Sequence, residues 1–391
     1  MTCRTETAGA LTYRFCPDDP PPMADRVRAV LRARAVDEIT QQPIEVDLSA
    51  STTVRGVTAR SAPFGRAGLV GQPARLFPDL AVNPVDLDLR LTARGYLPLD
   101  LSGTLGPIAG FPDQFAPLDL GDVGLHRVAV ALRGRTLRRG SLAPAVVAGA
   151  FVSVIGYWPV FPPPSVAPPL VMQPANLVGL APGCYAPRAA AAATLRRRDV
   201  PAVPGEDKTL LLPAARGTRR LRLSNRSALG AGTVLIVHPD DPGRRERIPV
   251  DQVDISSSVD QPAWITLAHP LAHTHLEGVL CQVGNPQMVL AAHALTRAAI
   301  PGDETVFLNG LAGLGNGVVV QIDDGVTPPE YHEAWLYQTV SDADGYFRLP
   351  PIARVAMVLL HAQRFGLAPP DDARLAPDYR VAENRITVMF P

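Results

Sequence analysis

The chain has 391 residues and no formal net charge, because 37 basic residues balance 37 acidic ones. This length allows two to four domains, each with a core of its own. A neutral chain has no net electrostatic attraction to nucleic acid or to anionic lipid, so we predict neither as a partner. Aromatic residues make up only 6% of the sequence, against 47% hydrophobic residues in all, which predicts aliphatic cores.

The N-terminal segment 1–23 is predicted to be a flexible leader, and Met23 is an alternative start. Arg4 and Glu6 stand where a secretory signal peptide would have an apolar core, so we predict none. No apolar run approaches the roughly 20 residues that cross a bilayer, which argues against direct membrane insertion. The four cysteines are scattered, as is typical of a reducing compartment. We therefore predict cytoplasmic synthesis, and a later place in a released or membrane-docked particle stays open.

Proline (41 residues) and glycine (32 residues) interrupt the sequence throughout, which favours many short strands separated by turns. Apolar and polar residues alternate with a period of two in several segments, as in half-buried strands. These segments are 44–48, 87–91, 128–132 and 152–154. Residues 27–36 are predicted to form a first strand, with a short helical turn as the alternative. An alanine run within 188–198 predicts a short helix. The expected fold class is all-β, with tandem β-sandwich modules, the second of which is interrupted by an inserted β domain.

An internal repeat lies in the second half of the chain. Residues 217–237 align with residues 302–322 without a gap, at an offset of 85 positions, and each copy continues into an acidic turn and a glutamate. The matched glycines and glutamates are Gly230 and Gly315, Gly232 and Gly317, and Glu246 and Glu330. Paired glycines predict a positive-φ turn between two strands. The repeat therefore predicts a pseudo-symmetric barrel or sandwich.

Two stretches resemble the carboxypeptidase regulatory-like module, a transthyretin-like β-sandwich. In the first, Val36-Asp37-Glu38-Ile39-Thr40 before Pro43-Ile44 is similar to the opening strand and turn, and Ala93-Arg94-Gly95-Tyr96 to the closing signature. The central Thr-Asp-x-x-Gly-x-Phe pattern is not cleanly present in this copy, and we assign 71–80 to its place.

The second match is split along the chain. Leu132-Arg133-Gly134-Arg135-Thr136 and the segment 150–154 resemble the first strands, whereas Ser341-Asp342-Ala343-Asp344-Gly345-Tyr346-Phe347 resembles the central hairpin. We infer that the repeat-bearing region is inserted into this second sandwich, because insertion is tolerated where the two ends of the host lie close together. The predicted organisation is a leader at 1–23, a first sandwich at 24–128, a second sandwich at 129–157 plus 338–391, a Pro-rich connector at 158–200 and an inserted β domain at 201–337.

The resemblance implies a function without catalysis, because such modules fold beside enzymes or build surface and assembly structures. The arrangement of leader, modules and Leu-Gly-x-Gly repeats resembles that of proteins from bacterial phage-tail-like contractile injection particles. It implies a structural subunit at a baseplate, cap or fibre junction, with other structural proteins of the particle as partners. Two alternatives stay open: a module that binds a surface glycan or a host protein, and a metal-dependent enzyme.

The residues that would serve such an enzyme form an H-x3-H-x-H pattern of His269, His273 and His275, followed by Glu277. On a strand, His273, His275 and Glu277 share one face, with a spacing that suits zinc or copper. Pro270 interrupts the pattern, and the alternative is an edge turn in which imidazoles bond to backbone groups. We predict no catalytic residue, no cofactor and no metal, and these four residues are the candidate ligands if a metal is bound.

Three further features have a functional and a structural interpretation. Asp342-Ala343-Asp344-Gly345 resembles the start of a calcium loop, but a hairpin turn explains it without a metal. Short arginine runs near 135–139, 196–198 and 244–247 are interpreted as solvated loops. Six dispersed aromatic residues are candidates for stacking on a glycan or for filling sandwich cores. They are Tyr157, Trp158, Trp264, Tyr331, Trp335 and Tyr337.

Overall fold

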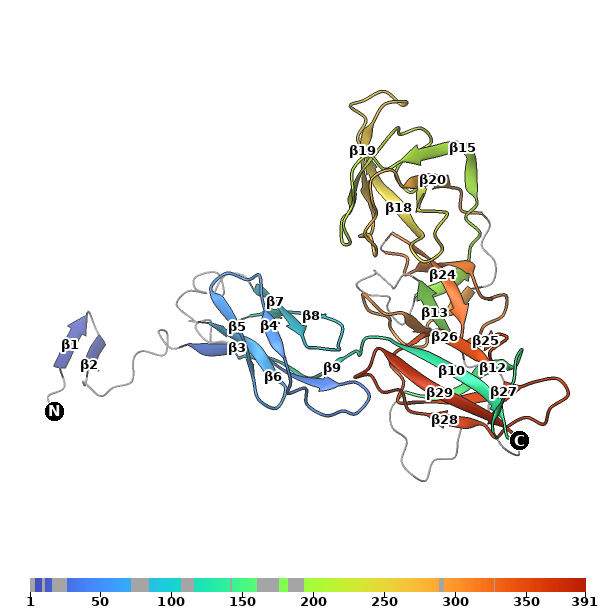
Figure 1. Cartoon of the computed structure of the whole chain (residues 1–391). Coiled ribbons are helices and arrows are strands. Elements are labelled where there is room, and N and C mark those ends of the chain that lie inside the picture. The colour runs from blue at the N-terminus through green and yellow to red at the C-terminus, as the bar shows by residue number, and fades with distance from the viewer. Residues whose placement is uncertain are drawn as a thin grey trace. The chain divides into compact units, whose positions relative to one another are not determined.

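The computed structural model describes residues 27–71, 84–106, 116–140, 143–159, 176–181, 193–287, 292–326 and 328–391, together with the backbone of a short N-terminal hairpin. Every regular element in these ranges is a β-strand, so the expected all-β class is confirmed (Figure 1). None of the same residues forms a helix of the length and apolarity that a membrane crossing requires. The chain divides into two compact units, Met1–His126 and Arg127–Pro391.

The N-terminal hairpin lies in the segment predicted to be a flexible leader, and it corrects that prediction in part. Strand β1 (Arg4–Ala8) pairs antiparallel with β2 (Leu11–Phe15). β1 contains two threonines, and β2 contains a threonine and two aromatic residues; such residues favour extended backbone.

The first unit contains a sandwich of two sheets, with strand orders β5-β6-β3-β9 and β4-β7-β8. Its strands are β3 (Arg28–Asp37), β4 (Ser49–Ser51), β5 (Val57–Ala62), β6 (Arg66–Gly71), β7 (Val85–Thr92), β8 (Leu99–Leu105) and β9 (Leu118–Leu125). Leu87, Leu89 and Leu91 of β7 are buried in the core between the sheets, as the period of two predicts. The strand predicted at 44–48 is wrong: its residues form a bend, in which Asp47 has a φ of 55°.

The family-like segments of this unit meet at the buried carboxylate of Asp37. It accepts hydrogen bonds from the backbone N–H groups of Ile39 and Thr40, both at 2.9 Å, and from the hydroxyl of Tyr96 at 2.6 Å. The turn that follows β3 is therefore tied to the turn that follows β7.

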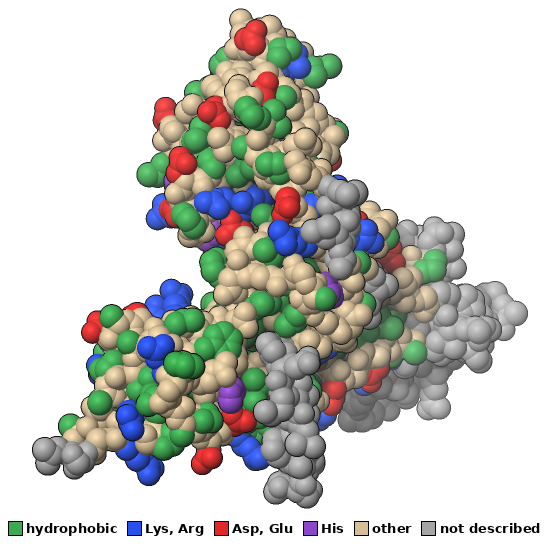
Figure 2. All heavy atoms as spheres, turned by 90° about the vertical axis from the view of Figure 1, so that its right-hand side faces the viewer, with side chains coloured by type: hydrophobic (Ala, Val, Ile, Leu, Met, Phe, Trp, Pro, Cys, Tyr) green, Lys and Arg blue, Asp and Glu red, His purple; other side chains and the backbone are tan. Residues whose placement is uncertain are grey.

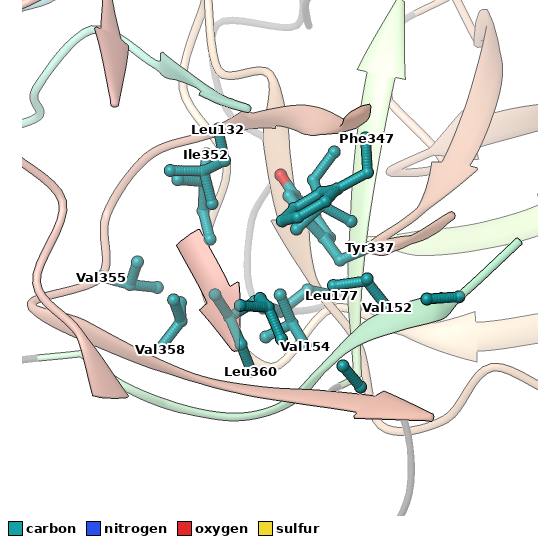
Figure 3. Packing of buried hydrophobic residues seen from close by; sticks show 14 of the residues in the cluster. Leu132, Val152, Val154, Leu177, Tyr337, Phe347, Ile352, Val355, Val358 and Leu360 are labelled. Atoms are coloured by element: carbon teal, nitrogen blue, oxygen red, sulfur yellow. The ribbon is translucent and has the colours of Figure 1, made fainter. Parts of the chain in front are cut away.

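A second sandwich is built from the two ends of the second unit. Its strands are β10 (Val130–Arg138), β11 (Ala145–Val146), β12 (Phe151–Trp158), β25 (Gln338–Val340), β26 (Tyr346–Ile352), β27 (Met357–Gln363), β28 (Ala373–Leu375) and β29 (Glu383–Phe390). One sheet has β10 between β26 and β29, and the other has the order β25-β12-β27-β28. Side chains from both ends of the unit, such as Leu132, Val154 and Phe347, point toward one another in a shared core (Figure 3).

The two sandwiches have the same central strand arrangement. Strand β3 pairs antiparallel with β6 and parallel with β9, as β10 does with β26 and β29. The backbone N–H of Ala35 donates to Gly65 O at 2.7 Å, and the N–H of Thr136 donates to Gly345 O at 2.8 Å. Gly65 and Gly345 have φ values of 70° and 77°. The central hairpin of the first module therefore turns at Gly65, which corrects its assignment to 71–80; residues 72–80 lie outside the described residues.

The region between the halves of the second sandwich contains two small barrels. The first barrel consists of β15 (Ala202–Thr209), β16 (Arg220–Leu223), β17 (Val234–Val237), β18 (Glu246–Val253), β19 (Ala263–Leu267) and β20 (Leu280–Gly284). Its strands follow one another in the order β15-β20-β17-β18-β19-β16, and a bridge between Leu210 and Leu223 closes the ring. Leu210, Leu223 and Cys281 belong to its buried core.

The second barrel repeats this ring with different chain segments. It consists of β13 (Leu177–Ala181), β14 (Thr194–Arg197), β21 (Ala292–Ala294), β22 (Thr305–Phe307), β23 (Val318–Asp323) and β24 (Glu330–Leu336). The order is β21-β14-β23-β24-β13-β22, and a bridge between Leu295 and Leu308 closes it, 85 positions beyond the bridge of the first barrel. The glycine turns match too, since Gly232 and Gly317 have φ values of 84° and 75°.

Strands β13 and β14 correct the predicted connector at 158–200 and the predicted helix at 188–198. Both strands complete the second barrel, yet they precede the first barrel in the chain. Residues 194–197 are extended because β14 pairs with β21 on one side and β23 on the other, which outweighs local helix propensity. Residues 182–192 lie outside the described residues. The first barrel is thus inserted into the second barrel, and the second barrel into the second sandwich.

The thiol of Cys281 offers a test of the first barrel. Burial raises the pKa of this thiol from 9.0 to about 12, and the thiolate is the reactive form. In a variant with Cys3, Cys16 and Cys184 replaced by Ser, we expect no labelling by a thiol reagent at pH 8 until urea unfolds the chain. Between pH 7 and 9 the native rate should stay negligible, whereas an ordinary thiol reacts roughly tenfold faster per pH unit below its pKa. Rapid labelling without urea would contradict the barrel.

Candidate interaction surface

The four residues proposed from the sequence as metal ligands do not converge. His269 is buried, and its Nε2 lies 2.9 Å from the carbonyl oxygen of Pro328 and 3.2 Å from that of Pro329. Because both neighbours are acceptors, Nε2 carries the hydrogen. His269 thus links the first barrel to the segment that leads into β24. Glu277 is exposed.

His275 instead belongs to a buried group around Glu246. Its Nε2 donates to Glu246 Oε1 at 2.8 Å, and the same carboxylate accepts the backbone N–H groups of Ala272 at 2.7 Å and His273 at 2.9 Å. Residues 271–278 form turns and bends with a single β-bridge at His275, not the strand on which His273, His275 and Glu277 would share a face. In the described part of the chain, no group of three His, Cys, Asp or Glu side chains is placed to hold a metal ion.

The second barrel has a similar pair that sequence inspection missed. His332 Nε2 donates to Glu330 Oε2 at 2.8 Å, and both side chains are buried. Glu330 is the repeat counterpart of Glu246, so the matched glutamates were the signal for this pair.

Between the two barrels, Glu333 accepts from Arg245 at 3.0 Å and from Arg247 at 2.8 Å. Figure 2 shows basic and acidic side chains side by side at this level of the molecule. These groups join the barrels.

The Asp-Gly segment before β26 forms a turn held by its own backbone. Asp342 Oδ1 accepts the backbone N–H groups of Asp344 at 2.9 Å and Tyr346 at 2.8 Å, and Gly345 has a φ of 77°. A Cβ atom at Gly345 would lie 2.7 Å from the carbonyl oxygen of Thr136, so glycine is required there. This geometry accounts for the sequence as a hairpin turn.

The six aromatic residues do not form one platform. Trp158, Tyr331 and Tyr337 are buried, and the Tyr337 hydroxyl donates to Pro351 O at 2.6 Å. Trp264 lies beneath Arg220, with 4.7 Å between the guanidinium carbon and the ring centroid. Trp335 is 38% exposed. Tyr157 packs against the core of the second sandwich, so core packing accounts for four of the six, and Trp264 and Trp335 are on separate strands.

A row of arginines crosses the outer face of the second sandwich. Arg133 at the centre of β10 is directly opposite Arg348 on β26 and directly opposite Arg385 on β29. Side chains in register on adjacent strands lie on the same face, so the three guanidinium groups form one row. In the next row, Arg135 stacks on Tyr346, with 4.9 Å between the guanidinium carbon and the ring centroid. We call the outward surface of β26, β10 and β29 the arginine face.

The arginine face lines an open groove of about 680 Å³, beside which Val340 of β25 is also exposed. Glu383 is the acid nearest the row, 3.0 Å from Arg133 and 3.4 Å from Arg385. The strands also correct the interpretation of several arginines as loop residues. Arg135 and Arg138 are in β10, Arg196 and Arg197 are in β14, and Arg247 is in β18.

The ring of Phe347 explains why glycine occurs at position 134, between Arg133 and Arg135. Gly134 is paired with Phe347, whose ring is buried. A Cβ atom at Gly134 would lie 2.2 Å from a carbon of that ring. Glycine thus allows the ring into the core, while Arg133 and Arg135 on either side of it project outward.

Comparisons with known proteins identify no relative. No family model matches the chain, and no curated protein matches it. Two crystal structures of the major pilin subunit of Bacillus cereus are each 7% identical to it, cover 93% of this chain and 99% of their own, and have TM-scores of 0.18 and 0.19. Similarity this low carries no argument about fold or function.

Proposed function

We propose that the chain is a non-enzymatic structural subunit that holds docking surfaces in fixed positions for the other proteins of an assembly. The observation that carries this proposal is the nested insertion within the second unit. A module inserted at both of its ends has two covalent connections to its host, which restrict its rotation more than a single linker does. Such rigidity has a use where several partners must be joined at set angles.

The contacts between the modules support the same role. Leu177 and Phe307 of the second barrel belong to the core of the second sandwich. The buried Arg354 of the sandwich donates to Asp303 of the second barrel at 2.8 Å. Buried apolar and ionic contacts of this kind resist domain motion, whereas polar, water-filled interfaces permit it.

The kind of assembly is proposed from the arrangement of the sequence. We propose a bacterial phage-tail-like contractile injection particle, in which the chain occupies a baseplate, cap or fibre junction. Sandwich modules that resemble the carboxypeptidase regulatory-like family, together with Leu-Gly-x-Gly repeats, support this proposal.

Purification of particles from cells that express the tagged chain tests the proposal. We expect the chain to co-migrate with sheath, tube or baseplate proteins through a density gradient, and to leave the particle fraction when particle assembly is blocked. A chain that stays at the top of the gradient in particle-producing cells would contradict the proposal. A tagged cytoplasmic protein of similar mass is the control for trapping.

A further inference from the structure

We infer that the arginine face docks an extended, carboxylate-rich segment of a partner protein. This inference rests on the proposed structural role and names the chemistry of one of its contacts. Its basis is the register of three strands that are far apart in the sequence, together with a comparison between the two sandwiches of the same chain.

The first observation is that the row is unfavourable in isolation. Like charges directly opposite each other on adjacent strands destabilise a sheet. Arg133 has an arginine opposite it on both sides, Arg348 and Arg385. Four arginines and two carboxylates, Glu383 and Asp342, line the groove, which leaves a local excess of two positive charges on a chain that has no net charge. A ligand of opposite charge would offset the repulsion within this exposed row of arginines, which otherwise lowers the stability of the sheet.

The second observation is that the first sandwich places acids opposite the equivalent arginines. Its central strand carries Arg32 and Arg34 at the positions of Arg133 and Arg135, since Ala35 and Thr136 make equivalent hydrogen bonds. Arg32 is paired across the sheet with Asp119, and Arg34 with Asp122. Arg34 Nε donates to Asp122 Oδ1 at 2.6 Å, and a second nitrogen of Arg34 reaches the other oxygen.

The last strand of the second sandwich has no acid at these two positions. Its residues at the corresponding cross-strand positions are Arg385, opposite Arg133, and Thr387, opposite Arg135. The first module therefore places an acid of its last strand opposite each of these two arginines, whereas the second module places an arginine and a threonine there. An incoming segment with carboxylates would replace the acids that β9 supplies in the first module.

The geometry favours an acidic peptide over a phosphate polymer. Guanidinium groups bind carboxylates through two parallel hydrogen bonds, as Arg34 and Asp122 do within this chain. The row spans three strands, about 10 Å at the usual strand spacing, which is short for a nucleic-acid track. Glu383 stands between two of the arginines and would repel a continuous line of phosphates. Tyr346 and Val340, 54% and 59% exposed, offer apolar contacts to the rest of a peptide.

The test is fluorescence anisotropy with the full chain and a fluorescein-labelled peptide of alternating Thr and Asp, with the matching Thr and Asn peptide as control. In an extended peptide the carboxylates project on one side, about 6.7 Å apart. We expect saturable binding of the acidic peptide that weakens as salt is added. Arg133→Glu should reduce the affinity about tenfold or more, since it removes one pairing and adds repulsion. Equal binding of the two peptides, or no binding at low salt, would overturn the inference.

A pair of variants separates the arginine face from general charge effects. Replacing Arg385 and Thr387 together with Asp copies the acids of β9 onto β29, and should abolish peptide binding without lowering the melting temperature. Arg32→Ser removes an arginine at the matching position of the first sandwich, and should leave binding unchanged. Equal losses from both variants, or tighter binding of a DNA duplex or of phosphatidylglycerol vesicles than of the peptide, would contradict docking of an acidic segment.

The particle experiment distinguishes this inference from the proposed function. If the chain co-migrates with particles and the double Asp variant does so equally well, the arginine face is not a docking site although the structural role stands. If the unaltered chain never enters the particle fraction, the proposed role fails irrespective of peptide binding.

Discussion

Replacing Arg354 with Met is expected to destabilise the second unit by about 3–5 kcal/mol, because it removes one partner of a buried ion pair. The guanidinium of Arg354 donates to Asp303 Oδ2 and to the carbonyl oxygen of Ala298, both at 2.8 Å. It also lies over the ring of Phe307, at 5.5 Å from the centroid, with Arg297 over the same ring at 4.5 Å. Methionine fills part of the space but leaves the carboxylate of Asp303 without this cation.

The measurement is urea unfolding followed by tryptophan fluorescence. All three tryptophans of the chain, Trp158, Trp264 and Trp335, are in the second unit, so the signal reports on that unit alone. Arg380→Met is the control, because the Arg380 side chain is 86% exposed and pairs only with neighbouring Asp378 in the ion pairs described. The control should change the free energy of unfolding by less than about 0.5 kcal/mol. Equal changes in the free energy of unfolding from the two substitutions would contradict a structural role for the Arg354–Asp303 ion pair between the second sandwich and the second barrel.

The destabilisation of the Arg354 variant should also depend on pH. Burial raises the pKa of the Asp303 carboxyl above its ordinary 3.8, and Arg354 opposes this rise. Without the guanidinium, the carboxyl has a greater tendency to bind a proton in the folded state. A raised folded-state pKa contributes stability that is present at low pH and is lost as the pH rises through that pKa. The variant should therefore lose stability, relative to the unaltered chain, as the pH is raised from about 4 toward neutrality.

Local sequence patterns identified many of the strands, because alternation and turn chemistry depend on residues close together. The leucines of 87–91 alternate with polar residues and form β7. The motif around Gly134 and the motif around Phe347 indicated two strands, and the structure pairs these two residues directly. The repeated glycines indicated equivalent turns in the two copies. The positive φ values of Gly232 and Gly317 explain why glycine occurs at both positions.

Strands that depend on distant partners escaped detection. Strands β13 and β14 have five and four residues within Pro- and Ala-rich sequence, and each becomes a strand by pairing with segments about 100 residues or more away. The opposite error arose at 44–48, where alternation is good. The N–H of Ile44 donates to Ala35 O of β3, but the contact with β3 does not continue as a strand, and Asp47 is left-handed. Alternation alone does not supply a neighbouring strand.

The arginine face could not be predicted from the sequence, because it also depends on pairing between distant strands. The row of Arg348, Arg133 and Arg385 exists only through the register of three strands, and register is set by the whole sandwich. One signal was available: Leu31-Arg32-Ala33-Arg34 and Leu132-Arg133-Gly134-Arg135 share a pattern in which alternate arginines leave a strand on one side. The acids opposite the first pair, Asp119 and Asp122, could not be matched to it without the parallel pairing of β3 and β9.

Substitution of Glu246, whose carboxylate is buried, should lower the free energy of unfolding as much as substitution of Arg354. Replacing Glu246 with Leu removes the acceptor of three hydrogen bonds, from the N–H groups of Ala272 and His273 and from Nε2 of His275. His275 loses its partner in a buried site and the other two donors in a partly buried one, and each buried donor without a partner costs about 1–3 kcal/mol. We expect the free energy of unfolding to fall by about 3–5 kcal/mol, the usual result of breaking a buried charged pair.

Glu277→Leu provides the matched comparison, since Glu277 is the exposed acid beside the same histidines. If the imidazoles are structural partners of Glu246, the Glu277 variant should unfold within about 0.5 kcal/mol of the unaltered chain. If His273, His275 and Glu277 held a metal instead, the Glu277 variant would lose stability and the chelator EDTA would lower the melting temperature of the unaltered chain. A large effect at Glu246, none at Glu277 and none from EDTA would assign the histidine cluster to the architecture of the first barrel, because the carboxylate of Glu246 binds all three donors from its place on β18.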